Sequence, residues 1–174
     1  MSTNEARPDC CIERNLVERA QPIIDALRAA DESVITAESC TGGLIAAVLS
    51  HGLRASESLH GGFVVYTKAN KARVLGVDAK LLESAGSVNE EVARQLAQGA
   101  LDRSPATIAL AVTGVLGPDP DEDGNPPGLV YFAVCKCGKP PIIRGRQFTE
   151  ENPDVVRRSV MLFALDLLQQ EIKS

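Results

Sequence analysis

The sequence predicts an α/β domain, a three-layer α/β/α sandwich built around a mixed, mostly parallel sheet. Segments with apolar residues at helical spacing alternate with short β-branched runs, and this order is typical of strands joined by crossover helices. Near the C-terminus, two strand-like segments flank the short turn 138–140. They predict an antiparallel pair and therefore a mixed sheet.

The first half of the chain is expected to hold three helices and two strands. Apolar residues recur at helical spacing from Leu16 to Ala30, and a β-branched run follows at 34–36. The predicted elements are a helix over 13–30, a strand over 34–36, a buried helix over 44–49, a strand over 63–67 opened by Gly61-Gly62, and a short helix over 72–75 stopped by Gly76.

The second half is expected to hold three helices, three strands and one long loop. Asp78 and Asn89 are typical N-cap residues, and Pro153 suits the first turn of a helix. The loop 114–128 carries four Gly, four Pro and four acidic residues; such loops often serve function, with disorder as the alternative. The predicted elements are helices from Asp78 to Ser84 and from Asn89 onward, strands over 106–113, 129–135 and 142–148, and a final helix over 153–172.

Composition excludes several classes of function. The 174 residues carry 18 basic and 23 acidic side chains, and the net charge of −5 offers no electrostatic footprint for nucleic acid. Aromatic residues make up only 3% and Trp is absent, so stacking platforms for single-stranded bases are nearly absent. No apolar run is long enough for a bilayer and no signal-peptide pattern is present, so we expect a cytoplasmic protein without a membrane partner.

We expect residues 1–12 to form a flexible polar leader and residues 13–174 to form a single domain. The five cysteines have irregular spacing and do not make a disulfide framework. Cys135 and Cys137 could supply half of a metal site, but no second pair follows them. Two positions apart on a strand, they are expected simply to share one face, and the sequence predicts no metal.

Polar and glycine-rich segments follow three of the predicted strands, at 38–43, 66–71 and 113–118. In sheets of this kind, sites form where strand ends meet helix starts. These three segments are therefore expected to meet in one site.

Ser39 is the candidate nucleophile. A serine between a strand and a glycine-bearing helix start can lie on a sharp turn, with its own amide or the next one aimed at an oxyanion. Two alternatives stay open at this point. Ser39 or Thr41 caps the helix and does no more, or Cys40 is the nucleophile, although a buried cysteine is usually inert.

A serine nucleophile needs a base. His51 and His60 each precede a glycine turn and belong to no triad motif, which leaves a lysine. Lys68 and Lys71 both follow the second strand, within reach of the Ser39 turn. The base would have to be desolvated or held near other cations, because an ordinary lysine has a pKa of ~10.4, and a solvated face is the default for both residues.

Two further features could hold an anion. The segment 113–118 has neither the Walker nor the dinucleotide spacing, yet a glycine-rich turn can still present backbone amides. Arg157 and Arg158 lie at the positive end of the last helix, where a phosphate would fit. The alternative for these arginines is exposed ion pairing with Asp154 or Glu150.

Four segments together resemble the CinA C-terminal domain family. The most specific are the Glu-Ser-Cys-Thr-Gly-Gly motif at 38–43 and the Thr-Gly-x-x-Gly-Pro motif at 113–118; the others lie at 61–71 and 88–92. The resemblance covers the chain from about Leu16 to its end. This family includes stand-alone nicotinamide-nucleotide amidases of the PncC type, which are described as serine–lysine amidohydrolases without metal.

The resemblance implies an α/β/α fold and hydrolysis of the amide of nicotinamide mononucleotide to nicotinate mononucleotide and ammonia, a salvage step that needs no cofactor. Ser39 matches the family's nucleophile. The family's lysine closes a segment that starts at Tyr66, so it matches Lys71 and not Lys68. Tyr66 is implied as a further catalytic residue, and family habit implies a homo-oligomer. The substrate-binding residues implied are Glu38 for the pyridinium charge, Arg157 or backbone amides for the phosphate, and Thr41, Gly42, Gly43, Thr113 and Gly114.

The sequence departs from the family pattern at 68–70, in the acidic loop 119–127 and at 150–153. The first change removes a polar contact near the base, and the extra carboxylates would repel a phosphate if they faced it. Two other hypotheses therefore stay open: a catalytically silent nucleotide-binding module, and a hydrolase that uses the Cys40 thiol.

Overall fold

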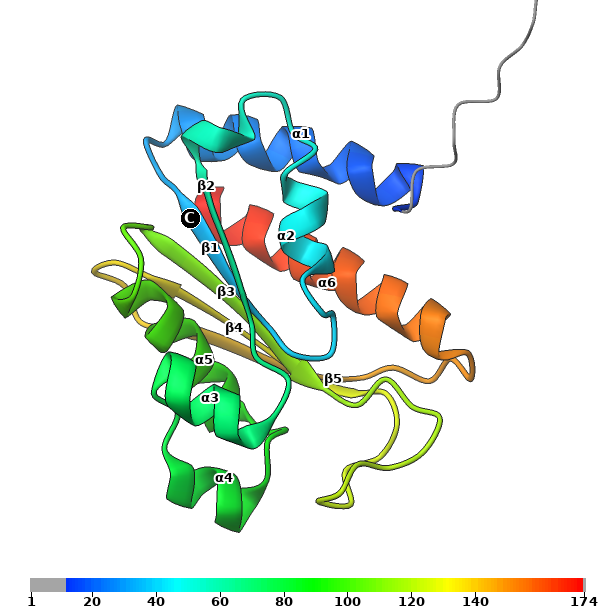
Figure 1. The fold of residues 1–174 in the computed structure, drawn as a ribbon. Helices are drawn as coiled ribbons and strands as arrows, with labels where there is room; N and C mark the ends of the chain where they lie inside the picture. Colours follow the sequence, from blue (N-terminus) through cyan, green and yellow to red (C-terminus); the bar gives the residue numbers. More distant parts are fainter. Residues whose placement is uncertain (1–11, 174) are drawn as a thin grey trace, which may run out of the picture.

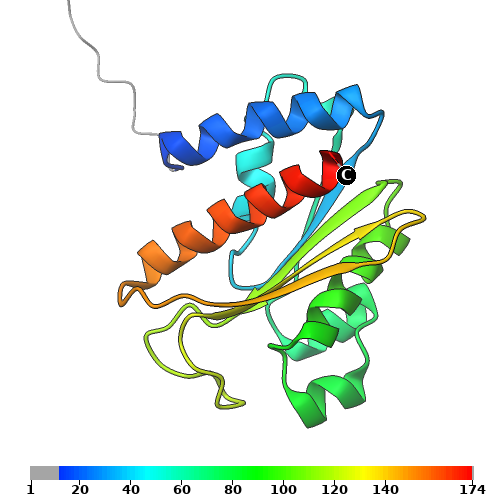
Figure 2. The same ribbon diagram turned by 180° about the vertical axis from the view of Figure 1, so that it is seen from behind.

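The computed structural model describes residues 12–173, in which five strands form one mixed sheet with helices on both faces (Figures 1 and 2). The predicted leader therefore lies outside the described residues, apart from Ile12. The elements are α1 (Arg14–Ala29), β1 (Val34–Glu38), α2 (Leu44–Leu49), a 3-10 turn (Ala55–Glu57), β2 (Leu59–Val64), α3 (Lys68–Leu75), α4 (Ala79–Ala85), α5 (Glu90–Asp102), β3 (Ile108–Gly114), β4 (Leu129–Lys136), β5 (Ile142–Gln147) and α6 (Pro153–Lys173).

The sheet has the strand order β2-β1-β3-β4-β5. Strand β1 pairs in parallel with β2 and β3, whereas β4 is antiparallel to both β3 and β5. Only β4 therefore runs against the other strands. Helices α1, α2 and α6 cover one face and α3, α4 and α5 the other, which confirms the predicted three-layer architecture (Figures 1 and 2).

Strand β3 lies at the centre of the sheet and is buried on both faces. Ile108, Leu110 and Val112 belong to the core under α1, α2 and α6, whereas Ala109 and Ala111 belong to the core under α5. Burial of each large aliphatic side chain contributes roughly 1.5–3 kcal/mol. Because its residues are held from both sides, β3 gives a rigid base for the groups at its end.

Strand β2 begins earlier than the predicted 63–67, and Gly61-Gly62 lie inside it rather than before it. A Cβ on Gly62 would come within 2.2 Å of Thr36 Oγ1 on the neighbouring strand β1. Gly62 therefore permits close packing of β2 on β1, whereas Gly61 adopts a positive φ of 116° that favours glycine. The sequence interpretation of this pair as a strand opener is wrong.

Helix α3 also begins earlier, at Lys68 instead of at 72. The Thr67 hydroxyl oxygen accepts a hydrogen bond from the amide of Asn70 at 3.2 Å and caps the helix. Lys68 and Lys71 consequently lie about one turn apart on the same side of this helix.

The two C-terminal cysteines lie on the α5 side of the sheet, as predicted, but they differ in burial. Cys135 is buried in β4, whereas Cys137 is exposed just beyond the end of that strand at Lys136. Within residues 12–173, no three His, Cys, Asp or Glu side chains come together as a metal site would require. In the same range, no helix has both the length and the apolar character needed to cross a membrane.

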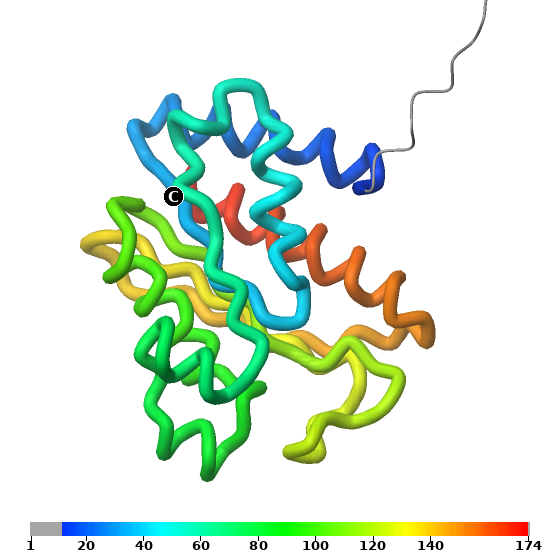
Figure 3. Tube along the Cα trace, in the orientation of Figure 1, coloured from blue at the N-terminus to red at the C-terminus, as the bar shows by residue number. Residues whose placement is uncertain are grey.

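The carboxyl ends of β1, β2 and β3 lie at one edge of the sheet because these strands are parallel. The chain leaves β1 toward α2 on one face and leaves β2 toward α3 on the other (Figure 1). Ligands bind in the crevice that such a divergence opens in α/β sheets. The long loop after β3, yellow-green in Figure 3, leaves the sheet at the same edge and extends beyond it.

Candidate active site

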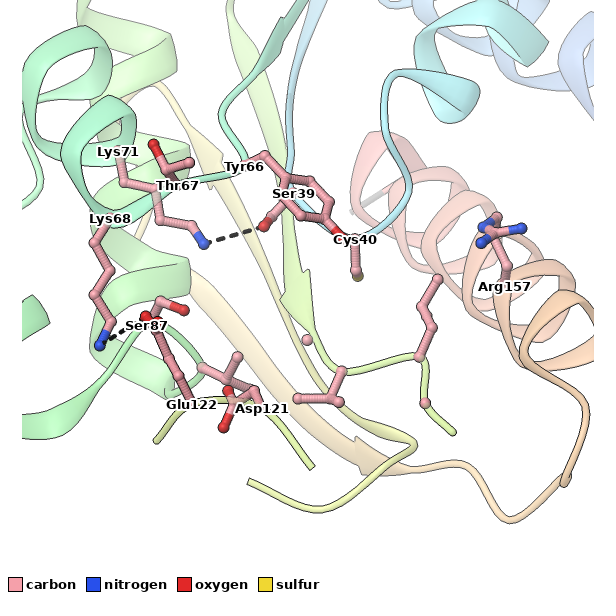
Figure 4. Close-up of a pocket in the computed structure, with 15 residues that line it drawn as sticks. Ser39, Cys40, Tyr66, Thr67, Lys68, Lys71, Ser87, Asp121, Glu122 and Arg157 are labelled. Atoms are coloured by element: carbon pink, nitrogen blue, oxygen red, sulfur yellow. Dashed lines mark hydrogen bonds and ion pairs between the residues drawn. The ribbon is translucent and has the colours of Figure 1, made fainter. Parts of the chain in front are cut away.

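A cavity of about 500 Å³ lies at this edge of the sheet. Its walls come from the turns after β1 and β2, the first turns of α3 and α6, the α4–α5 connection and the loop after β3 (Figure 4). The three polar segments predicted to meet do meet here. The polar side chains that line it are Ser39, Cys40, Tyr66, Thr67, Lys68, Lys71, Ser87, Asp121, Glu122 and Arg157.

Ser39 and Lys71 face each other across this cavity (Figure 4). Lys71 Nζ donates a hydrogen bond to Ser39 Oγ at 3.0 Å, although the residues are 32 positions apart in the chain. Both residues are buried, with exposed fractions of 5% for Ser39 and 1% for Lys71. The predicted proximity of this serine to this lysine is therefore confirmed.

The surroundings of Lys71 favour its neutral amine. Burial lowers the pKa of Lys71 below its ordinary value because the ammonium form loses hydration, and the positive charge of Lys68 acts in the same direction. Among the described residues, no carboxylate forms an ion pair with Lys71. An uncharged lysine amine at hydrogen-bond distance from a hydroxyl can accept its proton.

Cys40 also lines the cavity, but its thiol is a poor nucleophile. Burial raises the pKa of the Cys40 thiol to about 12, so the reactive thiolate is scarcely populated near neutral pH. An ammonium on Lys71 would oppose this shift without overcoming it. The physical chemistry therefore favours Ser39 over the thiol.

The amides around Ser39 are not equally available to an oxyanion. The Ser39 amide donates to the Val112 carbonyl of β3 at 3.0 Å, so it cannot also point into the cavity. The Val115 amide is likewise bound, to the Leu129 carbonyl at 2.9 Å. The amide of Cys40 donates to no other residue in the described range. Of the two amides considered from the sequence, only the one that follows the serine makes no hydrogen bond to another described residue.

Glu38 does not line the cavity, contrary to the predicted contact with a pyridinium ring. Its carboxylate, 1% exposed, turns back beneath the start of α2. There it accepts hydrogen bonds from three amides, those of Gly43 at 3.0 Å, Ile45 at 3.0 Å and Ala46 at 2.8 Å. The glutamate thus replaces the serine or threonine cap considered from the sequence, and its negative charge suits the positive end of the helix.

Four other predicted substrate contacts, Thr41, Gly42, Gly43 and Thr113, belong to the turns and do not line the cavity. The Thr41 hydroxyl donates to Glu38 at 2.7 Å, and the Thr113 hydroxyl donates to the Ser87 carbonyl at 2.8 Å. Gly42 and Gly43 adopt positive φ angles of 63° and 95°, where glycine is favoured. Of the predicted contacts in these two motifs, Gly114 is the one that lines the cavity.

Tyr66 and Arg157 lie on the cavity rim (Figure 4). Tyr66 is 72% exposed. Arg157 projects from the first turn of α6 and forms an ion pair with Asp154 at 2.6 Å. Both interpretations of Arg157 are thus compatible with its position, since an exposed ion pair is weak enough to yield to a phosphate.

The acidic loop noted in the sequence forms one side of this site, a placement that was not predicted. Asp121, Glu122 and Ser87 line the cavity, and Lys68 Nζ forms ion pairs with Glu122 at 3.1 Å and Asp123 at 2.6 Å. These contacts link α3 to the loop after β3, more than 50 residues away in the chain. The opposite charges were visible in the sequence, but no local spacing pairs them.

The comparisons with known proteins agree with this arrangement. A family model described as the CinA C-terminal domain matches residues 17–172. The chain belongs to the CinA C-terminal domain family. Among solved family structures, the competence/damage inducible protein CihA from Agrobacterium tumefaciens superposes with a TM-score of 0.88 at 33% identity, covering 95% of this chain and 99% of that one.

The relatives in this family differ in length. The nicotinamide-nucleotide amidohydrolase PncC of Escherichia coli K12 is 35% identical over 159 residues, 91% of this chain and 96% of that protein. The CinA-like protein of Mycolicibacterium vanbaalenii is 39% identical over 143 residues, 82% of this chain. The match spans only 34% of that longer protein. Similarity to the amidohydrolase therefore extends over nearly the whole of both chains.

The Glu38 contacts generate a first prediction. Glu38→Gln keeps the size of the side chain but turns an NH2 group toward amides that need an acceptor, so we expect a loss of about 1.5–3 kcal/mol in the free energy of unfolding. Urea denaturation of both proteins measures this change in the free energy of unfolding. Glu83→Gln, at an exposed carboxylate on α4, is the matched control and should change stability by less than about 0.5 kcal/mol. Equal effects of the two substitutions would contradict the assigned capping role.

Burial of Lys71 generates a second prediction. The unfolded chain holds the Lys71 proton up to about pH 10.5, whereas the folded protein releases it at lower pH. Below pH 10.5, folding must therefore remove this proton or bury the charge, which lowers the free energy of unfolding; above pH 10.5 this cost disappears. Lys71→Met should therefore be more stable than the wild type at pH 7. Its advantage should shrink as the pH rises toward 10.5.

Urea denaturation of both proteins over a pH series measures this difference, with Lys80→Met at an exposed position of α4 as the control. A stability gain that grows with pH, or no gain at pH 7, would show that Lys71 is not a destabilised neutral amine.

Proposed function

We propose that the protein is an amidohydrolase that converts nicotinamide mononucleotide to nicotinate mononucleotide and ammonia, with Ser39 as nucleophile and Lys71 as base. The observation that carries this proposal is the 3.0 Å contact between Ser39 Oγ and the buried Lys71 amine. The choice of substrate rests on the similarity to the Escherichia coli nicotinamide-nucleotide amidohydrolase.

The proposed reaction begins with a proton transfer. Neutral Lys71 takes the Ser39 hydroxyl proton as Oγ attacks the carboxamide carbon and forms a tetrahedral intermediate. Lys71, now an ammonium, returns this proton to the amide nitrogen, the C–N bond breaks and ammonia leaves. Tyr66 is a second candidate for this proton donation, because its side chain lines the same cavity.

Water completes the cycle. Lys71 removes a proton from a water molecule that attacks the ester on Ser39, and the released serine oxygen takes that proton back from Lys71. The product acid keeps the second proton of the water and loses it to solvent, so the product leaves as the carboxylate. We assign the oxyanion contact to the Cys40 amide, with Gly114 on the facing wall, because the amide of Ser39 is bound to β3. No metal or cofactor takes part in these steps.

The charges of the cavity suit a zwitterionic substrate. Arg157 is the proposed contact of the 5′-phosphate, at a helix start where an anion is favoured. The positive pyridinium ring would face the acidic side, formed by Asp121 and Glu122, in place of Glu38. In Figure 4, Asp121 and Glu122 lie on one side of the cavity and Arg157 lies on another, so the two kinds of charge are separated within it.

The two other hypotheses have less support. A thiol hydrolase is disfavoured by the raised pKa of Cys40, about 12. A silent nucleotide-binding module would not need a buried lysine without an ion pair, because such a residue costs stability and adds no affinity. The homo-oligomer and the cytoplasmic location stay predictions.

Ammonia release from nicotinamide mononucleotide tests the proposal. Ser39→Ala and Lys71→Met should each lower kcat/KM by at least about a hundredfold, since each removes a group that acts in the chemical step. Cys40→Ala should keep most of the activity. Circular dichroism of each variant checks that the fold is retained.

Three results would contradict the proposal. A wild-type protein that binds the nucleotide in calorimetry without releasing ammonia would be a binding module. Activity that survives in Ser39→Ala and disappears in Cys40→Ala would belong to the thiol. If the protein neither binds nor hydrolyses nicotinamide mononucleotide, its substrate is a different compound.

A further inference from the structure

The proposed base lies beside an acidic loop, which poses an electrostatic problem. Asp121 and Glu122 line the same cavity as Lys71, and the charges of Asp121 and Asp123 are near enough to raise the pKa of Lys71. A carboxylate that reached the Lys71 amine would stabilise its ammonium form and remove the base. The loop must therefore be prevented from pairing with it.

Each of the three carboxylates has other partners. Asp121 accepts hydrogen bonds from the backbone amides of Asp123 at 3.0 Å and Asn125 at 2.8 Å, and from the Asn125 side chain at 2.9 Å. Glu122 and Asp123 are both held by Lys68, at 3.1 and 2.6 Å. Lys68 thus forms ion pairs with Glu122 and Asp123, the two carboxylates that have no partner within the loop itself.

Contacts other than the ion pair with Lys68 also fix the position of Asp123. Its Oδ2 accepts a hydrogen bond from the Ser87 amide at 3.2 Å. Gly86 makes room for the carboxylate, since a Cβ there would lie 2.5 Å from Asp123 Oδ2, and its φ of +73° disfavours any other residue. The carboxylate is therefore fixed between the α4–α5 connection and the start of α3.

We propose that Lys68 is a positioning residue, which holds Glu122 and Asp123 in ion pairs and so keeps the catalytic amine of Lys71 without an acidic partner. The assignment of Lys71 as catalytic rests on the proposed function. Lys68 and Lys71 lie three residues apart on α3, so the side chains occupy neighbouring positions on the helix surface.

The other charged or titratable groups around Lys71 fit this role. Cys40, after β1, stays a protonated thiol because burial raises its pKa to about 12. Asp121, on the loop after β3, is occupied by its own turn. Tyr66 and Arg157 line the cavity from the end of β2 and from α6. Lys68 is therefore the group whose removal would release carboxylates next to the base.

A pH titration of Lys71 tests the proposal without any substrate. The protein is labelled with [13Cε]lysine, and the Lys71 signal is identified by its absence in Lys71→Arg. In Lys68→Met, the pKa of Lys71 should rise by about one to three pH units, because the freed carboxylates then stabilise the ammonium and the repulsion from the Lys68 charge is lost. Lys68→Arg, which keeps the charge, is the matched control and should leave the pKa near the wild-type value.

A rescue variant separates this effect from a general opening of the loop. In Lys68→Met/Glu122→Gln/Asp123→Asn, the Lys71 pKa should fall most of the way back, since no charge is left to pair with the amine. The proposal is overturned if Lys68→Met leaves the pKa unchanged, or if the triple variant stays as high as Lys68→Met.

A second variant keeps the test valid if Lys68→Met does not fold. Glu122→Gln/Asp123→Asn, with Lys68 intact, should lower the Lys71 pKa, and a rise would contradict the proposal. Because these titrations need no turnover, they test the role of Lys68 independently of the proposed amidohydrolase activity. Where the wild type is active, the acid limb of the kcat/KM profile should move to higher pH in Lys68→Met together with the Lys71 pKa.

Discussion

A hydrogen bond between a buried amine and a buried hydroxyl is the contact on which this site depends. Lys71 Nζ and Ser39 Oγ lie 3.0 Å apart in a cavity that gives the lysine almost no contact with water. Loss of hydration is expensive for an ammonium and tolerable for a neutral amine. The same burial that weakens the fold therefore provides a base, and a serine hydroxyl beside a neutral amine is the chemical unit of an acyl-transfer site.

The scaffold brings the two groups together by fixing the ends of three parallel strands. Ser39 is anchored through its own amide to β3, and Glu38 ties the next helix down with three amide contacts. Lys71 is set by a helix that starts directly after β2, under a threonine cap. The polar side chains of Glu38 and Thr41, which the sequence assigned to substrate binding, instead stabilise the turn after β1. This explains why a motif can be specific to a family while most of its residues never face the cavity.

Much of this arrangement could be predicted from the sequence. Periodicity and β-branched runs predicted the layers and the mixed sheet, and the polar strand ends predicted where the site would lie. The residues alone did not separate Lys68 from Lys71; the family resemblance did, because the distinction depends on where α3 begins. Glu38 was misplaced because its partners are backbone amides, which no sequence pattern displays. The pairing of Lys68 with Glu122 and Asp123 spans more than 50 residues, and only the fold brings them together.

The most direct test of an activated Ser39 uses a fluorophosphonate, which phosphonylates a reactive serine and releases fluoride whatever the natural substrate is. We expect peptide mass spectrometry to find the label on Ser39, with a labelling rate that rises as Lys71 loses its proton and that collapses in Lys71→Met. Labelling of Lys71→Met at the wild-type rate, or a wild-type protein that stays unlabelled at every pH, would contradict the account.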